Sequence, residues 1–516
     1  MDEQQAENGK DGKFDYLVIG TGLIESMVAH HLASSDSSTT VLQVDPNSFY
    51  GQSWAAVELD ALQSGSYVCT SSSSFTSAPG STGPSSTSPV RQNKSSAYSL
   101  SLQPTLVPAR GTFVDALVAS NVAPYLSFQL LHAFILAQPD LSLLPLPGSK
   151  HDLFRMSQLS LLDKRLLMRF FQAILEPDRL LLPEPGQSLS DYLSRPPYMI
   201  TNPRLVTVIG ALSLSAAEDP AAGPVLRRLK TLLSAIGRHP SATLSALPAA
   251  LLLGEYGGGG EWAEGFVRAA AVTGRATQVL GRPVLSLRQS IDGTQQRWII
   301  RLGRQSGHPV GGEDHLEFSA GRLLVSQQYL SLLLPDISPP PTSYTISRAI
   351  AIVGRSGLDK LNQLGKVETA ELRGSHALVV FPPEEGCADR RPVHVLIVGP
   401  DSGSCPEDEQ IIYLSSIIPG PHPPFDPTQL LEPVLDRLLR SASSSAPQEV
   451  LRSSTFYSQS VPHLPPPSTT PSASWIVPSW PAEPERSGLA EVVEWAAETA
   501  ENLAKQLVST SDSSLE

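Results

Sequence analysis

The sequence has little cysteine and little positive charge. Its three cysteines, Cys69, Cys387 and Cys405, are widely spaced, and no CxxC pair is present that could hold zinc or form a redox couple. This usage favours a reducing compartment. The 37 Lys and Arg residues are outnumbered by 50 Asp and Glu residues, which gives a formal net charge of −13. Because nucleic-acid binding needs a concentrated basic surface, nucleic acid is not expected as a partner.

Long hydrophobic runs are also missing. The N-terminal segment MDEQQAENGKDGKFDY is polar and acidic, unlike a signal peptide, and no stretch approaches the ~20 apolar residues of a membrane helix. The C-terminal SSLE lacks a prenylation cysteine. Neither HExxH nor GxSxG occurs, so zinc and serine hydrolases gain no support. We therefore expect a soluble, cytosolic protein without a metal site.

The clearest folded unit follows the N-terminal tail. An apolar run, Phe14–Ile19, ends in a glycine turn and leads into an apolar stretch, Leu23–Leu32, that predicts a helix. A second buried strand, Thr40–Val44, is closed by Asp45. Strand, glycine turn, helix and strand within about 30 residues are typical of the first βαβ unit of a doubly wound α/β sheet.

The rest of the chain divides by composition. Ser, Thr, Pro and Gly dominate residues 64–97, which predicts a disordered insertion, and a Pro/Ser-rich linker is expected at about 441–481. Leucines at helical spacing predict a helical domain over 150–240, inserted into a sheet domain formed by 1–135 and 241–516, with a closing helix at 489–507. The strands expected in the later part, as an antiparallel sheet, are Val284–Leu287, Trp298–Leu302, Leu323–Val325, Tyr344–Val353, Ala377–Phe381 and His394–Val398.

The glycine turn departs from the dinucleotide-binding fingerprint. Gly20 and Gly22 supply its first two small residues, but Glu25 stands at the third position, where its charge would repel a pyrophosphate. Asp45 stands where a ribose-binding acid belongs, although an Asp before Pro and Asn also simply starts a turn. The stretch 474–480, SWIVPSW, offers no Gly-Asp closure over a cofactor. No cofactor is therefore expected.

Several segments together resemble one family, the Rab escort proteins and the related Rab GDP-dissociation inhibitors. They are DYLVIGTGLIESMVAHHLA with VLQVDPNSFYG, then SLQPTLVPARGTFVDALVASNVAPYLSF, then YGGGGEWAEGFVRAAAVTG. The family also carries a glutamate at the position of Glu25. The resemblance implies a flavoprotein-like (FAD/NAD(P)-binding, GDI-like) α/β sheet domain with an inserted helical domain and no flavin chemistry.

Other segments are similar to the escort branch of the family. These are DLFRMSQLSLLDKRLLMRFFQAIL, Tyr344–Ala349 and Glu498–Leu503. The resemblance implies a non-catalytic accessory subunit that binds a GDP-bound, unprenylated Rab GTPase and presents it to the Rab geranylgeranyl transferase heterodimer. It also implies contact with the geranylgeranyl lipid and a transient contact with the membrane that receives the prenylated Rab.

Carried over to this sequence, the family's Rab-binding platform falls on Tyr50, Glu261 and Arg268. The alternative for Glu261 and Arg268 is an intrahelical pair on a solvated face, and for Tyr50 a turn aromatic packed over the sheet edge. Phe170 or Phe171 is the candidate anchor for transferase docking, and the alternative is that these rings are core residues.

Two further functions remain open at the level of sequence. A GDP-dissociation inhibitor would share the platform without docking the transferase. A flavin-dependent oxidoreductase, from a different class, is motivated by Gly20, Gly22 and Asp45.

Overall fold

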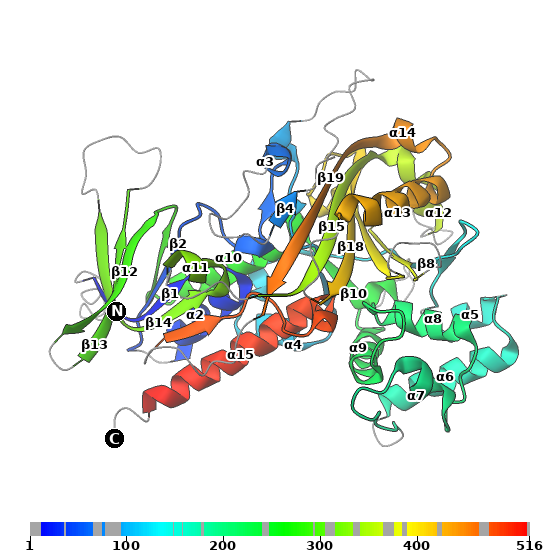
Figure 1. Cartoon of the computed structure of the whole chain (residues 1–516), viewed down its shortest axis with the longest axis horizontal. Coiled ribbons are helices and arrows are strands. Elements are labelled where there is room, and N and C mark those ends of the chain that lie inside the picture. Colours follow the sequence, from blue (N-terminus) through cyan, green and yellow to red (C-terminus); the bar gives the residue numbers. More distant parts are fainter. Residues whose placement is uncertain are drawn as a thin grey trace.

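The structure is a computed structural model in which two sheets and a helical domain lie side by side (Figure 1). The described residues are 12–35, 38–64, 75–77, 94–147, 149–156, 158–176, 180–239, 247–292, 295–304, 315–333, 341–364, 376–383, 390–420, 426–463 and 474–512. Within these ranges no helix is long and apolar enough to cross a membrane.

The first sheet contains the N-terminal unit predicted from the sequence. Its strands lie in the order β11 (Ala276–Leu280), β2 (Val41–Asp45), β1 (Lys13–Ile19), β14 (Leu316–Ser326), β13 (Gln295–Leu302) and β12 (Val284–Asp292), and β20 (Ser474–Val477) also pairs with β14. β1 runs parallel to β2 and to β14, with Phe14 beside Ala320. The middle of this sheet therefore pairs chain segments that are some 300 residues apart in sequence.

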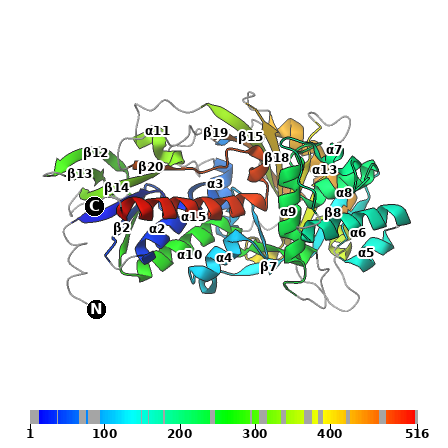
Figure 2. The ribbon, with the colours of Figure 1, turned by 90° about the horizontal axis from the view of Figure 1, so that it is seen from below.

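Three helices pack together beside this sheet. α2 (Leu23–Ser35) lies between α10 (Gly259–Val272) and the long C-terminal helix α15 (Glu491–Asp512), as Figure 2 shows. α2 is buried on most of its surface because it has the sheet on one side and helices on the other. The predicted strand, glycine turn, helix and strand are confirmed.

In the part of the chain that the structure describes, the second sheet has eight strands. They lie in the order β4 (Phe75–Ser77), β19 (Leu451–Pro462), β15 (Thr342–Gly354), β18 (Glu409–Pro419), β17 (Val393–Val398), β16 (Ala377–Phe381), β8 (Ala133–Ala137) and β9 (Leu143–Pro145). α13 (Pro427–Ala442) and α12 (Asp359–Leu364) cover one face, where Leu431, Leu435 and Leu438 meet the sheet. The strands expected from the sequence thus form two sheets rather than one.

Smaller elements join the two sheets to the helical domain. β6 (Leu106–Pro108), β10 (Leu251–Gly254) and β7 (Phe128–Leu130) form a three-stranded sheet, and β3 (Ala56–Val57) pairs with β5 (Leu100–Ser101). α4 (Thr112–Ala119) has no side-chain cap of its own. Instead Glu494 of α15 accepts a hydrogen bond of 2.6 Å from the Thr112 backbone N–H, and burial raises the pKa of Glu494 to about 7.

In the described residues, the helical domain has five α-helices. They are α5 (Lys150–Arg155), α6 (Leu161–Leu175), α7 (Leu189–Ser194), α8 (Pro203–Leu212) and α9 (Ala222–Ala235), all within the predicted range 150–240. Ser160 and Asp163 form a capping box at the start of α6. Leu167, Ile209 and Leu229 lie in one core that continues under the eight-stranded sheet.

Two segments differ from the expectation of disorder or linker. Within 64–97, Phe75–Ser77 form β4 and Ser95–Ala97 form a short 3₁₀ turn, while 65–74 and 78–93 lie outside the described residues. Within 441–481, β19 is a long buried strand paired with β15 and β4. Composition misled the prediction because serine can be buried once both sides of the backbone are hydrogen-bonded, and Phe456 and Tyr457 anchor this strand in the core.

Candidate functional site

The glycine turn between β1 and α2 has the expected geometry, but the protein's own side chains fill the space beside it. Gly20 has a φ of 123°, and a Cβ there would lie 2.7 Å from Nε2 of Gln52 and 2.9 Å from Cβ of Ser326. A Cβ on Gly22 would lie 2.7 Å from Oε1 of Gln52 and would also collide with Glu25. Both glycines are therefore required by internal packing.

Glu25 is buried at the start of α2, with 3% of its surface exposed. The pKa of its carboxyl is raised to about 7, mainly by burial and to a smaller extent by the charge of nearby Asp45, whereas a hydrogen bond with Ser326 opposes the shift. Among the described residues no donor reaches Oε1 of Glu25. A dinucleotide pyrophosphate would have to displace this side chain and Gln52.

Asp45 is buried and its hydrogen-bonding capacity is used within the protein. Its Oδ2 accepts hydrogen bonds from the Thr21 backbone N–H at 2.8 Å and the Thr21 hydroxyl at 2.6 Å. Its Oδ1 accepts from the Asn47 backbone N–H at 2.9 Å and the Tyr329 hydroxyl at 2.6 Å. Four donors saturate a carboxylate, so Asp45 has no lone pair left for a ribose. The residues present therefore do not fit a flavin dinucleotide. The hydrogen bond from the Asn47 backbone N–H to Asp45 agrees with the interpretation of Asp45 as a residue that starts a turn.

The stability of Glu25→Gln relative to wild type is expected to increase as the pH rises from 5 to 8. Because the pKa of Glu25 is raised on folding, wild type loses stability as pH rises through about 7, whereas a neutral glutamine does not titrate. The difference in unfolding free energy should grow by about 2 kcal/mol over this range. Urea denaturation at both pH values measures it, and Glu432→Gln on the exposed surface of α13 is the control. A difference that does not change with pH would contradict the assignment.

The three predicted platform residues come together on the rim of the first sheet. Gly51, with a φ of 95°, brings the loop after β2 onto the start of α10, where a Cβ on Gly51 would lie 2.9 Å from Cα of Gly260. The pKa of the half-buried Tyr50 is raised by desolvation and then by the charge of Glu264, and Arg268 acts against the shift. Tyr50 therefore lies within electrostatic reach of the α10 surface that carries Glu261 and Arg268.

Glu264 belongs to this group and was missed by the sequence prediction. It pairs with Arg268 at 3.0 Å, one helical turn away, and both side chains remain partly exposed. The pKa of Glu261 is raised by desolvation and then by the Glu264 charge. The spacing of four residues between Glu264 and Arg268 was the available signal, because such pairs face each other on a helix. We define the platform as Tyr50, Glu261, Glu264 and Arg268.

The two phenylalanines of α6 differ in burial. Phe170 is fully buried, and its ring lies 5.2 Å from that of Tyr198 and 6.1 Å from that of Phe171. The prediction of an exposed docking anchor is therefore wrong for Phe170, because its position on α6 faces the core of the helical domain. Phe171 is only half-buried, next to the exposed Gln172, and stays a candidate.

The fold and this site define a class of protein. The chain has a sheet domain of the dinucleotide-binding type whose nucleotide crevice is filled by Glu25 and Gln52, and it presents a polar platform on the rim of that sheet. A fold of this type does not by itself define a function, so the function has to be argued from these side chains.

Comparison with known proteins finds similar chains of one kind. Residues 10–179 match the family model described as GDP dissociation inhibitor. The Saccharomyces cerevisiae protein named Rab proteins geranylgeranyltransferase component A is 26% identical over 446 residues, which cover 84% of this chain. The Arabidopsis thaliana Rab escort protein 1 is 24% identical over 465 residues, covering 78% of this chain and 76% of its own length. The chain is therefore similar to Rab escort proteins and GDP dissociation inhibitors.

A solved structure supports the fold assignment. The crystal structure of a Rab GDI from Plasmodium falciparum superposes with a TM-score of 0.65 at 16% identity, covering 95% of this chain and 98% of that one. The predicted GDI-like fold is confirmed. The chain spans 66% of the length of the yeast relative.

Proposed function

We propose that the protein is a Rab escort protein. It binds a GDP-bound, unprenylated Rab GTPase, presents it to Rab geranylgeranyl transferase and delivers the prenylated Rab to membranes. The observation that carries this proposal is the platform, in which Tyr50 from the loop after β2 lies within electrostatic reach of Glu264 and Arg268 on α10. The names of two relatives support it: the yeast protein is named as a component of Rab geranylgeranyltransferase and the Arabidopsis protein as a Rab escort protein.

The chemistry of the platform suits a protein surface with exposed backbone and mixed charge. The Tyr50 ring offers apolar area and a hydroxyl, while the guanidinium of Arg268 and the carboxylate of Glu261 offer charge-assisted hydrogen bonds. Arg268 has 57% of its side chain exposed, and its pair with Glu264 is a solvated one that a partner can displace at small cost. The residues therefore stabilise the fold little and are available for binding.

The helical domain supplies the second contact of the proposed function. Phe171, between the exposed Arg169 and Gln172 of α6, is the proposed anchor for the transferase. Without this contact the same platform would serve a GDP-dissociation inhibitor, which is the second candidate and is motivated by the Plasmodium structure. A flavin oxidoreductase is disfavoured by the filled crevice around Glu25 and Gln52.

Reconstituted prenylation tests the proposal. Purified protein is mixed with GDP-loaded unprenylated Rab, the transferase heterodimer and geranylgeranyl diphosphate, and lipid transfer to Rab is followed by mass spectrometry. Transfer is expected only when the protein is present, and the three proteins should co-elute before lipid is added. Failure to support transfer at any concentration would sink the escort function. Extraction of prenylated Rab from membranes without transferase binding would favour the inhibitor.

A further inference from the structure

The helical domain exposes an unusual share of the apolar surface. Of the fourteen large hydrophobic side chains that are exposed in the described part of the chain, seven lie between Phe154 and Met199. One of them, Leu175, faces a crevice between α4, α9 and α15. We call the other six the leucine surface: Phe154, Leu161, Leu162, Leu181, Leu182 and Met199, each at least 52% exposed.

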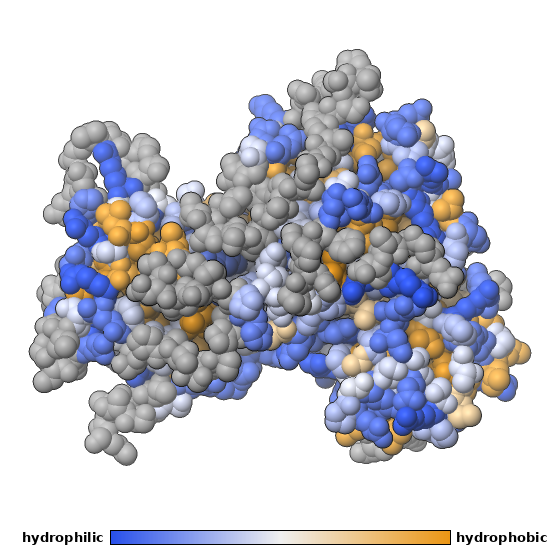
Figure 3. Space-filling model, in the orientation of Figure 1, coloured by the Kyte–Doolittle hydropathy of each residue, from blue (hydrophilic) through white to orange (hydrophobic). Residues whose placement is uncertain are grey.

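Hydrogen bonds link Phe154 and the segment after Met199 to the first turn of α6, and link the segment before Met199 to Leu181. Lys164 donates a hydrogen bond of 2.9 Å to the backbone oxygen of Phe154, and Asn202 donates one of 3.1 Å to Asp163. The hydroxyl oxygen of Tyr198, the residue next to Met199, accepts a hydrogen bond of 3.2 Å from the backbone N–H of Leu181. Figure 3 shows apolar residues gathered over α5 and α6 at the outer side of the helical domain.

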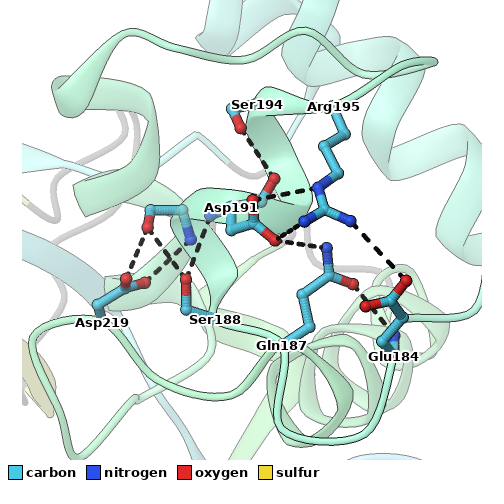
Figure 4. Close-up of polar contacts among 8 residues, drawn as sticks. Glu184, Gln187, Ser188, Asp191, Ser194, Arg195 and Asp219 are labelled. Carbon is cyan, nitrogen blue, oxygen red and sulfur yellow. Dashed lines mark hydrogen bonds and ion pairs between the residues drawn. The ribbon is translucent and has the colours of Figure 1, made fainter.

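A polar network fixes the chain immediately after Leu182. Arg195 binds Asp191 at 2.8 Å and reaches Glu184 at 3.9 Å, and Gln187 donates to Asp191 at 2.8 Å (Figure 4). On the other side, the Tyr192 hydroxyl donates to the backbone oxygen of Leu181 at 2.6 Å. The two leucines, 53% and 80% exposed, are thus held outward by bonded neighbours on both sides.

The charge of the helical domain differs in sign from that of the rest. Residues 150–239 contain 12 Lys and Arg and 8 Asp and Glu, which gives a formal charge of +4. Because the whole chain has a formal charge of −13, the remainder carries −17. On α6, Arg165 and Arg169 are exposed one turn apart, on the outward side of the same helix that begins with Leu161 and Leu162. Apolar tips beside exposed arginines are the pattern of surfaces that insert into the interface of anionic membranes.

We propose that the leucine surface docks the protein on a membrane that contains anionic lipids. Its side chains come from four separate segments of the chain, and fluid acyl chains adapt to such an uneven outline more readily than a rigid protein surface does. Arg165 and Arg169 lie close enough on the same helix to meet lipid phosphates while the leucines enter the acyl boundary. The inference deepens the membrane step and rests on the proposed function in that respect, but binding to vesicles is a property of this chain alone.

Vesicle flotation with the purified protein, without Rab or transferase, tests the inference. Vesicles of phosphatidylcholine with phosphatidylserine are expected to carry the wild-type protein, and vesicles of phosphatidylcholine alone to carry much less. Leu181→Ser combined with Leu182→Ser should reduce binding by about tenfold or more, because two leucines no longer leave water. Arg165→Gln combined with Arg169→Gln should remove most of the preference for phosphatidylserine.

Leu285→Ser is the matched control, because this leucine is 51% exposed on β12, outside the helical domain. It should bind vesicles like wild type. All substituted side chains are exposed, so circular dichroism should show unchanged folding. Wild type that does not float with anionic vesicles, or a leucine double variant that floats as well as wild type, overturns the inference. Loss of transferase capture by the double variant without any change in flotation also overturns it and assigns the surface to a protein partner. None of these outcomes depends on whether Rab binds the platform.

Discussion

Replacing both Tyr50 and Arg268 with alanine is expected to weaken binding to GDP-loaded Rab by about 100-fold or more. An aromatic and an arginine on one small platform are the residue types that dominate protein interfaces, and losing a pair of them typically costs ~2 to 4 kcal/mol. The fold should be almost unaffected, because Arg268 makes only a solvated pair with Glu264 and Tyr50 is half-buried in a loop. Affinity is measured by titration calorimetry, and stability by thermal unfolding.

Arg440→Ala is the matched control for this prediction. Arg440 is 61% exposed and pairs with Asp436 one helical turn away at 2.8 Å, the same geometry as Arg268 with Glu264, but on α13. It should leave Rab affinity unchanged. Equal affinity of the platform variant and wild type would remove the site assignment while leaving the fold assignment intact.

Phe170→Ala is expected to destabilise the protein by about 3–5 kcal/mol, whereas Phe171→Ala should cost much less. The Phe170 ring is fully buried against Tyr198, so its removal leaves a cavity in the helical domain. Phe171 is half-buried and loses less contact with the core. The functional effect should be reversed, with capture of the transferase falling about tenfold in Phe171→Ala.

Chemical denaturation and a transferase pull-down with Rab present measure the two effects. Tyr125→Ala, which removes a 45% exposed aromatic outside the helical domain, is the control and should change neither. If Phe171→Ala binds the transferase like wild type, Phe171 is not the anchor, and the exposed positions Arg165, Arg169 and Gln172 of α6 become the next to replace.

The parts of the structure that could be predicted from the sequence are those that depend on local sequence patterns. The first βαβ unit was predictable because Gly20 and Gly22 interrupt two continuous apolar runs. The position of Glu25 in the glycine motif was enough to predict that a pyrophosphate would not fit, and the structure adds that Gln52, from the loop after β2, fills the same space. The platform on Tyr50, Glu261 and Arg268 was reached by resemblance rather than by pattern.

What could not be predicted depends on contacts between distant segments. Nothing near Asp45 in sequence indicates that Tyr329 would complete its hydrogen bonds, because the two residues are 284 positions apart. β19 could not be predicted because its serine content is typical of a linker. It is a strand because β15 and β4 pair with its backbone on both sides. Likewise, only the packed core distinguishes Phe170 from Phe171.

The pairing of α2 with α15 has a consequence for biosynthesis. α2 is complete after residue 35, but the helix that covers it begins at Glu491. At ribosomal rates of about 5–20 residues per second, the apolar outer side of α2 waits on the order of half a minute or more for its partner. During that time this apolar surface of the nascent chain is exposed and prone to aggregate. We therefore expect translation intermediates of this protein to depend on holding chaperones until α15 emerges.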